Sequence, residues 1–253
     1  MTVLDRFDLT GKIVVVTGGS RGLGRAMVHG FAEAGADVVI SSRKLDACEA
    51  LAKEIEAETG RRAFPVACHV GHWDDCGALV DTVYDEFGRV DVFVNNAGMS
   101  PLYESLAAVT EELYDKTFAV NMKGPFRLGA LVGARMAAGD GGSIINVTTA
   151  GSLMVGVNEV PYACAKAGLN ALTVGLAQAY APKVRVNTIM PGAFLTDVTK
   201  HWASETVNDV GAPLGRIGMP DEIVGAALYL GSDASSYTTG AVIRIDGGIT
   251  RRV

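Results

Sequence analysis

Short apolar runs, mostly of β-branched residues, recur along the chain, and each is followed by a longer stretch whose apolar positions repeat with helical period. Because the short runs do not alternate between apolar and polar positions, they predict strands buried on both faces of a parallel sheet. The predicted strands span residues 12–16, 37–41, 63–68, 90–94, 143–147, 184–189 and 241–245.

The amphipathic stretches predict helices over residues 22–35, 45–59, 73–87, 110–138, 160–180 and 221–230. Strict alternation of strands and helices implies right-handed crossovers, with helices on both faces of one α/β sheet. Ligands of such sheets bind beyond the carboxyl ends of the strands. The loops expected to converge there are 17–24, 41–44, 68–72, 95–100, 148–160 and 190–215.

Composition restricts the class of protein. The 253 residues are 49% hydrophobic and include no Pro- or Ser-rich linker, which predicts a single domain over residues 1–253. A net charge of −6 without a basic tract disfavours nucleic acid and anionic membranes as partners. The chain begins without signal-peptide features, and its four cysteines lack CxxC spacing, so we expect a cytoplasmic protein. No metal site is expected, because ligand-like spacing is missing at His29, His72 and His201.

The first predicted strand runs into a glycine-rich turn that opens a helix. Gly18, Gly22 and Gly24 lie within seven positions. Glycine allows positive φ and close approach of the backbone to a ligand, and the helix start directs unpaired N–H groups at a pyrophosphate. The spacing is TGxxxGxG rather than GxGxxG, so the loop by itself is weak evidence for a dinucleotide.

A candidate for acid–base chemistry lies in the predicted helix 160–180. Tyr162 and Lys166 are four residues apart and share a helical face. A nearby cation is expected to lower the pKa of a phenol from about 10 toward the range useful for proton transfer. Two further features strengthen this hypothesis, the polar turn VTTAGS just upstream and Asn121 in an otherwise apolar stretch.

These features occur together with others in a familiar order. They are TGGSRGLG at 17–24, NNAG at 95–98, Asn121, the YxxxK pair at 162 and 166, PG followed by Thr196 at 191–196, and the tail ending in RIDGG at Gly248. Over nearly its whole length the chain resembles a single-domain short-chain dehydrogenase/reductase. The resemblance implies a Rossmann-like, doubly wound, mostly parallel seven-stranded sheet, bound NAD(H) or NADP(H), and hydride transfer between nicotinamide C4 and a carbonyl or alcohol carbon.

The resemblance also implies roles for individual residues. Tyr162 is the expected general acid or base, and Lys166 the residue that lowers its pKa and binds the nicotinamide ribose. Asn121 is expected to hold a water that links Lys166 to solvent. The cofactor-binding residues implied are Gly18, Ser20, Arg21, Gly22, Leu23, Gly24, Ser42, Arg43, His69, Val70, Asn96, Ala97, Gly98, Tyr162, Lys166, Pro191, Gly192, Phe194 and Thr196.

Two positions depart from the family pattern. Thr149 stands where a serine usually hydrogen-bonds the substrate oxygen; its hydroxyl can still donate, but its methyl group narrows the pocket, and Ser152 is the alternative. His69 stands where an aspartate usually accepts from the adenine amino group. Hydroxyls in such a turn also commonly bond local backbone, and Asn121 could be a buried bridging amide.

Cofactor choice follows from charge. An acid after the second strand would bind the ribose 2′-OH of NAD(H), whereas a 2′-phosphate requires a cation. This chain has Ser42 and Arg43 there, with Arg21 in the glycine loop, and guanidinium groups suit phosphate. We predict a preference for NADP(H), with NAD(H) possible; the alternative for Arg43 is a solvated surface charge.

Substrate and assembly are less determined. Residues 193–214, with 99–105 and 152–160, are expected to cover a small-molecule carbonyl or alcohol substrate, although 193–214 equally suits oligomer packing. The resemblance implies a homotetramer built from pairs of helices rich in small residues and from the C-terminal strand region. The small residues could instead serve helix–sheet packing within the chain; they include Gly129, Ala130, Gly133, Ala134, Ala167, Gly168 and Ala171.

Three function classes remain open at this point. The first is an NADP(H)-dependent carbonyl reductase or alcohol dehydrogenase, favoured by Tyr162, Lys166 and Asn121. The second is a nicotinamide-dependent epimerase or lyase that recycles its hydride and leaves absorbance at 340 nm unchanged. The third is a non-catalytic NADP-binding sensor or scaffold, motivated by Thr149 and His69.

Overall fold

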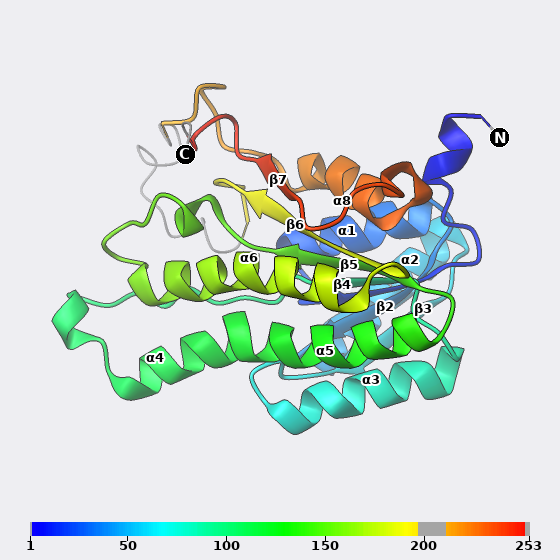
Figure 1. The fold of residues 1–253 in the computed structure, drawn as a ribbon, viewed down its shortest axis with the longest axis horizontal. Helices are drawn as coiled ribbons and strands as arrows, with labels where there is room; N and C mark the ends of the chain where they lie inside the picture. Colours follow the sequence, from blue (N-terminus) through cyan, green and yellow to red (C-terminus); the bar gives the residue numbers. More distant parts are fainter. Residues whose placement is uncertain (1, 197–210, 251–253) are drawn as a thin grey trace.

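The strands of the chain form one parallel sheet in a computed structural model that describes residues 2–196 and 211–250. Within these residues the sheet has seven strands in the order β3-β2-β1-β4-β5-β6-β7 (Figure 1). The strands are β1 Ile13–Thr17, β2 Asp37–Ser42, β3 Ala63–Ala67, β4 Val92–Asn95, β5 Gly142–Val147, β6 Val184–Pro191 and β7 Val242–Ile245. This confirms the predicted Rossmann-like α/β fold.

Strand order reverses at the centre of the sheet. β1 pairs in parallel with β2 on one side and with β4 on the other, so the chain winds outward in both directions from this point. The loops that leave the carboxyl ends of β1 and β4 therefore start side by side. They carry the glycine-rich turn and the NNAG motif, which brings the two motifs to one crevice.

Helices cover both faces of the sheet (Figure 1). On one face α1, α2 and α8 pack on the sheet through residues such as Phe31, Leu51 and Leu230; on the other, α3, α5 and α6 pack through residues such as Leu79 and Leu128. The helix bounds are α1 Gly22–Glu33, α2 Leu45–Thr59, α3 Trp73–Phe87, α4 Glu111–Phe118, α5 Gly124–Ala138, α6 Val160–Tyr180 and α8 Val224–Gly231. Among the described helices, none has the length and apolarity needed to span a bilayer.

The long predicted helix over 110–138 contains a π-helical turn. α4 and α5 are joined by a π-helical turn at Ala119–Lys123, which contains the buried Asn121. A π turn inserts one extra residue per turn and is frequent at functional sites. The backbone stays helical through this turn, so the single predicted helix is present as α4, the π turn and α5 without a break. The predicted helix over 221–230 is divided into a 3-10 turn at Pro220–Ile223 and α8.

Two of the small residues predicted to pack between subunits pack inside the chain. A Cβ at Gly129 would lie 2.7 Å from the Leu176 side chain, and a Cβ at Gly133 would lie 2.3 Å from the Tyr180 ring. Both contacts join α5 to α6. At these two positions the need for glycine is explained by the close packing of α5 on α6 within one chain.

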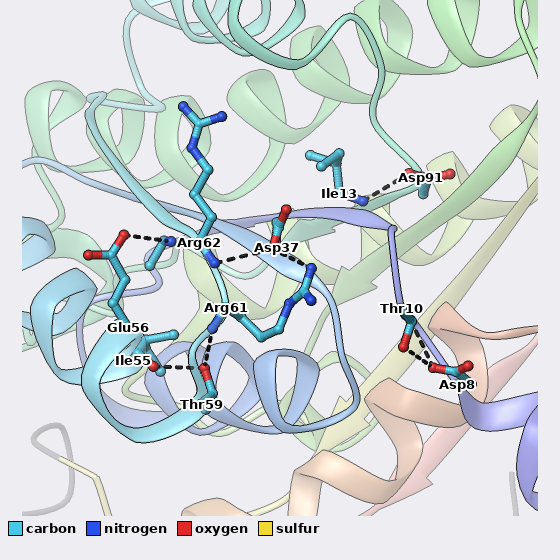
Figure 2. A network of polar contacts seen from close by, with 11 residues as sticks. Asp8, Thr10, Ile13, Asp37, Ile55, Glu56, Thr59, Arg61, Arg62 and Asp91 are labelled. Atoms are coloured by element: carbon cyan, nitrogen blue, oxygen red, sulfur yellow. Dashed lines mark hydrogen bonds and ion pairs between the residues drawn. The ribbon is translucent and has the colours of Figure 1, made fainter.

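Two aspartates form hydrogen bonds at the amino-terminal ends of the strands (Figure 2). This edge of the sheet is opposite the carboxyl ends, from which the glycine-rich turn and the NNAG segment leave. The Asp91 carboxylate accepts from the backbone N–H of Ile13, at 2.9 Å, where β1 begins. Asp37, the first residue of β2, accepts from the Arg61 guanidinium at 2.6 Å and from the Arg62 backbone N–H at 3.1 Å. This edge is therefore held together by structural ion pairs and N–H to carboxylate hydrogen bonds.

Replacing Asp91 with alanine should destabilise the protein without affecting cofactor binding. The carboxylate is buried and also accepts from Arg89 Nε at 3.0 Å, so its loss leaves the buried Ile13 N–H without its acceptor. We expect the free energy of unfolding, measured in urea, to fall by about 2–3 kcal/mol. Asp91→Asn, which keeps one acceptor oxygen, should lose less. A change below about 0.5 kcal/mol in Asp91→Ala, within the range of ordinary surface substitutions, would contradict the assignment.

Candidate active site

The glycine-rich turn lies between the NNAG segment and the segment after β6. Gly18 has φ +63° and is so close to the NNAG backbone that an added Cβ would lie 2.9 Å from Ala97 Cα. Gly22 has φ +54°, and a Cβ there would lie 3.5 Å from the Thr196 side chain. Three predicted cofactor loops, far apart in sequence, therefore meet at the carboxyl end of the sheet.

Asn96 holds the glycine-rich turn in place. Its side-chain amide donates to the carbonyls of Thr17 at 2.9 Å and Gly18 at 3.1 Å. In return the Thr17 hydroxyl accepts from the backbone N–H groups of Asn96 and Ala97 and donates to the Val94 carbonyl at 3.1 Å. The Asn96 side chain thus fixes the backbone of the glycine-rich turn through two hydrogen bonds to its carbonyl groups.

The turn has the features that a pyrophosphate requires. α1 begins at Gly22, and its N-cap residue Arg21 makes no side-chain capping hydrogen bond, which leaves the first-turn N–H groups available to an anion. Only glycine can occupy position 24 without a shift of the backbone, because a Cβ on Gly24 would lie 2.2 Å from the Gly18 carbonyl oxygen. The residues present are therefore compatible with a dinucleotide. Leu23 lies behind them and packs on the core.

Lys166 is a buried ammonium group on α6. Its side chain is 2% exposed, and Nζ donates to the carbonyl of Val147, the last residue of β5, at 2.8 Å. Burial lowers the pKa of Lys166 to about 8. Burying a charged amine is costly, and a group with such a shifted pKa in a cleft is a candidate functional residue.

Tyr162 lies one turn earlier on the same face of α6. Lys166 Nζ is 5.9 Å from the centroid of the Tyr162 ring. The pKa of Tyr162 is nevertheless raised to about 12, mainly by burial and further by the Glu159 carboxylate, while a hydrogen bond with the Thr149 side chain opposes the increase. Desolvation therefore outweighs the other influences on this phenol, and the Lys166 ammonium donates to the Val147 carbonyl; that Lys166 lowers the pKa of Tyr162 stays a prediction.

The two candidate hydroxyls upstream have different partners. Ser152 is buried, donates to the Thr149 carbonyl at 2.7 Å and accepts from the Asn170 side-chain amide at 3.0 Å. Thr149 Oγ1 accepts from the Gly151 N–H at 3.2 Å and hydrogen-bonds Tyr162. The hydroxyl beside the phenol is therefore that of Thr149.

Asn121 bridges the π turn to the loop after β4. Its Nδ2 donates to the carbonyls of Met99 at 2.8 Å and Thr117 at 2.9 Å, and its Oδ1 accepts from the Met99 N–H at 3.2 Å. The space beside Gly98 borders both polar groups, since a Cβ there would lie 3.1 Å from Asn121 Oδ1 and 3.6 Å from Lys166 Nζ. The buried amide bridge considered from the sequence is present, and it lies next to Lys166.

The segment after β6 forms the far wall of the site. Gly192 fits tightly, because a Cβ there would lie 2.8 Å from Asp246 Cα. Phe194 is buried and forms a parallel bridge with Gly218, whose carbonyl accepts from the Leu195 N–H at 2.8 Å. Pro191 ends β6 and leads into this wall. Of the predicted substrate loop 193–214, residues 197–210 lie outside the described residues.

His69 presents a donor where the family pattern has an acceptor. Its Nδ1 accepts from the Gly71 N–H at 3.1 Å, so Nε2 carries the proton in the neutral ring. The pKa of His69 is lowered, first by burial and then by His72, whose ring stacks on it at 4.2 Å between centroids. Val70, next in the chain, is buried in the core, and its carbonyl accepts from the Cys76 thiol at 3.3 Å.

The end of β2 carries no acid. Ser42 is partly buried and donates to the Lys44 carbonyl at 3.2 Å, while Arg43 is exposed at the carboxyl edge of the sheet. In the glycine-rich turn Arg21 is exposed and Ser20 is partly buried. Both arginines follow strands that are neighbours in the sheet, β1 and β2.

Sequence reasoning missed a pair of residues beside the site. The Tyr103 hydroxyl donates to the Val157 carbonyl at 2.8 Å and accepts from the Val160 N–H at 2.9 Å, which caps the first turn of α6 from another loop. Glu159 lies between these two bonds and influences Tyr162. Helical spacing gave a signal for Glu159, which is three residues before Tyr162, but none for Tyr103.

Histidine spacing in the sequence also missed a cluster in space. His29 lies between Glu54 and Glu58 of α2, with Nε2 and Nδ1 at 3.2 and 3.4 Å from their carboxylate oxygens. The ligand atoms of these three residues lie within 4.8 Å of one another. Both imidazole nitrogens face carboxylates and Arg25 forms an ion pair with Glu54, so the group joins α1 to α2 through polar side-chain contacts.

Comparison with known proteins agrees with this geometry. A family model described as "Enoyl-(Acyl carrier protein) reductase" matches residues 18–250. A 3-oxoacyl-[acyl-carrier-protein] reductase of Chlamydia trachomatis is 37% identical, covering 95% of this chain and 98% of the relative. A D-threitol dehydrogenase of Mycolicibacterium smegmatis is 36% identical, covering 96% and 95%. The crystal structure of a gluconate 5-dehydrogenase from Burkholderia cenocepacia with NADP and tartrate has a TM-score of 0.94, 32% identity and full coverage of both chains.

The doubly wound sheet, the glycine-rich turn at its switch point and these relatives define an NAD(P)-dependent oxidoreductase. The chain belongs to the short-chain dehydrogenase/reductase family, as its sequence predicted. Relatives with this fold are named as dehydrogenases and reductases of different substrates, so family membership alone does not identify the substrate.

Proposed function

We propose that the protein interconverts a carbonyl group and a secondary alcohol with NADP(H), and that Tyr162 is its general acid and base. The observation that carries this proposal is the shared face of α6, on which Tyr162 lies beside the Thr149 hydroxyl and above the buried Lys166. The nicotinamide supplies or accepts the hydride. The chain's own residues bind, orient and move the proton.

During reduction the substrate oxygen gains a proton from the Tyr162 hydroxyl. Its raised pKa keeps this group protonated at neutral pH, ready to donate. Thr149 already accepts from the Gly151 N–H, so its own proton is available to the same substrate oxygen. Two donors are then aimed at one oxygen, which stabilises the negative charge that develops on it.

Lys166 and Asn121 serve the proton supply and the cofactor. In this proposal Lys166 binds the ribose hydroxyls, and its positive charge favours ionised Tyr162 when the proton leaves. Asn121 holds the Met99 backbone, and its Oδ1 keeps a lone pair on the side of Gly98 for a water that leads to Lys166. Through this water the proton lost by Tyr162 is replaced from solvent.

The remaining cofactor residues divide by the part of the dinucleotide that they face. The glycine-rich turn binds the pyrophosphate, Asn96 to Gly98 border the ribose, and residues from Pro191 to Thr196 hold the carboxamide. His69 donates through Nε2 to a ring nitrogen of the adenine, replacing the usual acceptor with a donor.

The test is the oxidation of NADPH by the purified protein with ketones, aldehydes, keto sugars and acyl thioesters, followed at 340 nm. Loss of absorbance with at least one class is the expected result. Conversion of substrate without net change in absorbance would identify an epimerase or lyase instead. Tight NADPH binding without turnover on the whole panel would indicate a sensor or scaffold.

Arg43→Ala should weaken NADPH binding selectively. The exposed guanidinium follows β2, where this chain lacks the acid that a 2′-hydroxyl needs, so we propose that it binds the 2′-phosphate. Losing a charge-assisted hydrogen bond should raise the Kd for NADPH about 10- to 100-fold, as measured by fluorescence titration. The Kd for NADH should change little, and Arg135→Ala on α5 is the control. Equal or tighter binding of NADH by the unmodified protein would refute the preference.

We further propose a homotetramer assembled through two interfaces, the outer faces of α5 and α6 and the region of the C-terminal strand β7. Phe126 and Val174 are each 44% exposed on these two helices. Covering such side chains is favourable when two copies pair these faces. Light scattering should give four times the chain mass; a monomer would contradict the proposal.

A further inference from the structure

A carboxylate lies beside the proposed acid–base residue. Glu159 is the N-cap residue of α6, three positions before Tyr162, and its charge acts on the Tyr162 hydroxyl. Its side chain fills space left by two glycines of the preceding loop. A Cβ at Gly151 would lie 2.6 Å from Glu159 Oε1, and a Cβ at Gly156 would lie 3.3 Å from the same oxygen.

The Glu159 carboxylate has no polar partner in the described chain. Across residues 2–196 and 211–250 its oxygens make no hydrogen bond or ion pair, and the residue is partly buried. Lys166, the buried cation of the site, donates to the Val147 carbonyl and not to Glu159. A half-buried carboxylate without a partner keeps its full capacity to accept hydrogen bonds from a ligand.

The backbone that carries this carboxylate is held on both sides. The Tyr103 hydroxyl bonds the carbonyl of Val157 and the N–H of Val160, which flank Glu159 in the chain. The Glu159 carbonyl in turn accepts from the Ala163 N–H at 2.8 Å in the first turn of α6. Such bracing keeps the acceptor in position before a ligand arrives and lowers the entropy lost on binding.

The carboxylate is close enough to the reacting groups to contact the same small molecule. Gly151, over which Oε1 lies, donates through its N–H to Thr149 Oγ1, and Thr149 hydrogen-bonds Tyr162. The charge of Glu159 is also one of the causes that raise the pKa of Tyr162. A substrate whose carbonyl oxygen meets Tyr162 and Thr149 therefore presents its neighbouring carbons to Glu159.

We propose that Glu159 is a specificity-determining residue, which accepts a hydrogen bond from a hydroxyl group next to the reacting carbon and repels substrates with an anionic group there. The preferred substrates are then hydroxy ketones and the corresponding vicinal diols. This inference rests on the proposed carbonyl–alcohol activity and adds a substrate class to it.

Three ketones of the same shape test the inference. In 1-hydroxy-2-butanone a hydroxyl replaces a methyl group of 3-pentanone, and 2-oxobutanoate carries a carboxylate at the same place. For the unmodified protein we expect kcat/KM for the hydroxy ketone to exceed that for 3-pentanone about 10- to 100-fold, the range for a hydrogen bond to a charged acceptor. The keto acid should be the poorest of the three.

Glu159→Gln keeps the shape of the side chain and removes its charge. In this variant the preference for the hydroxy ketone should fall below about 5-fold, the keto acid should gain at least about 10-fold, and 3-pentanone should change less than about 2-fold. Glu104→Gln removes an exposed acid from a neighbouring loop and is the matched control, with all three ratios unchanged.

The outcomes distinguish failure of the role proposed for Glu159 from failure of the proposed carbonyl–alcohol activity. If other carbonyl compounds are reduced but the hydroxy ketone is not preferred, or if Glu159→Gln leaves the ratios as they were, the role of Glu159 is refuted and the carbonyl activity stands. If NADPH is oxidised with none of the compounds, including the broad panel, the proposed function itself fails.

Discussion

Tyr162→Phe should reduce kcat/KM for carbonyl reduction by about 10³- to 10⁴-fold, because a positioned proton donor contributes about that much to such reactions. The phenylalanine ring keeps the packing of α6 and the contact of Lys166 with the aromatic face. The Kd for NADPH should therefore change less than about threefold, so that the loss falls on kcat. Steady-state kinetics together with a fluorescence titration measure the two quantities.

Tyr114→Phe is the matched control for this variant. Tyr114 is 46% exposed on α4 and stacks on Phe118, away from the residues proposed to carry the reaction. Its kinetic constants should stay within about twofold, as expected for a surface position. Loss of less than tenfold in Tyr162→Phe, with the control unchanged, would contradict proton donation by Tyr162.

The direction of the Tyr162 pKa predicts how each reaction depends on pH. Burial and Glu159 raise this pKa to about 12, so the donor form dominates throughout the neutral range. The ionisation of Tyr162 should therefore leave the rate of reduction unchanged between about pH 6 and 8. Oxidation needs ionised Tyr162, so its rate should increase as pH rises. Glu159→Gln should shift that rise to lower pH.

The sheet and the meeting of its loops could be predicted from the sequence because both follow from short-range pattern. Apolar runs without alternation define buried parallel strands, and connection rules then bring Gly18, Asn96 and Tyr162 to the same edge. The predicted strand ends lie within two residues of those observed; β1, for example, spans Ile13–Thr17 where 12–16 is predicted.

What the sequence could not predict depends on contacts between distant residues. The choice between Thr149 and Ser152 follows from the Asn170 amide, eighteen positions beyond Ser152 in the chain, which engages the serine. The raised pKa of Tyr162 follows from burial, which no spacing reports. The YxxxK spacing placed Lys166 on the right face but could not show that its ammonium is engaged with Val147.

Lys166→Met should make the protein more stable while it loses activity. The side chain is 2% exposed, and its pKa is lowered to about 8 by burial, which means that the fold disfavours the charge at neutral pH. Each pKa unit corresponds to 1.36 kcal/mol, so the lowered pKa sets an upper bound of about 3 kcal/mol on this cost. Allowing for the hydrogen bond to Val147 that is lost, we expect the free energy of unfolding at pH 7 to rise by about 2 kcal/mol.

The pH dependence distinguishes this explanation from a general improvement in packing. Between the folded pKa of about 8 and the ordinary value of 10.5, the unfolded protein binds more protons at Lys166 than the folded protein does. The contribution of Lys166 to stability therefore rises with pH across this window, and the advantage of Lys166→Met should shrink as pH approaches 10. Lys183→Met removes an exposed ammonium that also donates to a backbone carbonyl, that of Gly139, and should not stabilise the protein. An advantage of Lys166→Met that is independent of pH would mean that packing, and not a desolvated charge kept for the cofactor, accounts for the gain.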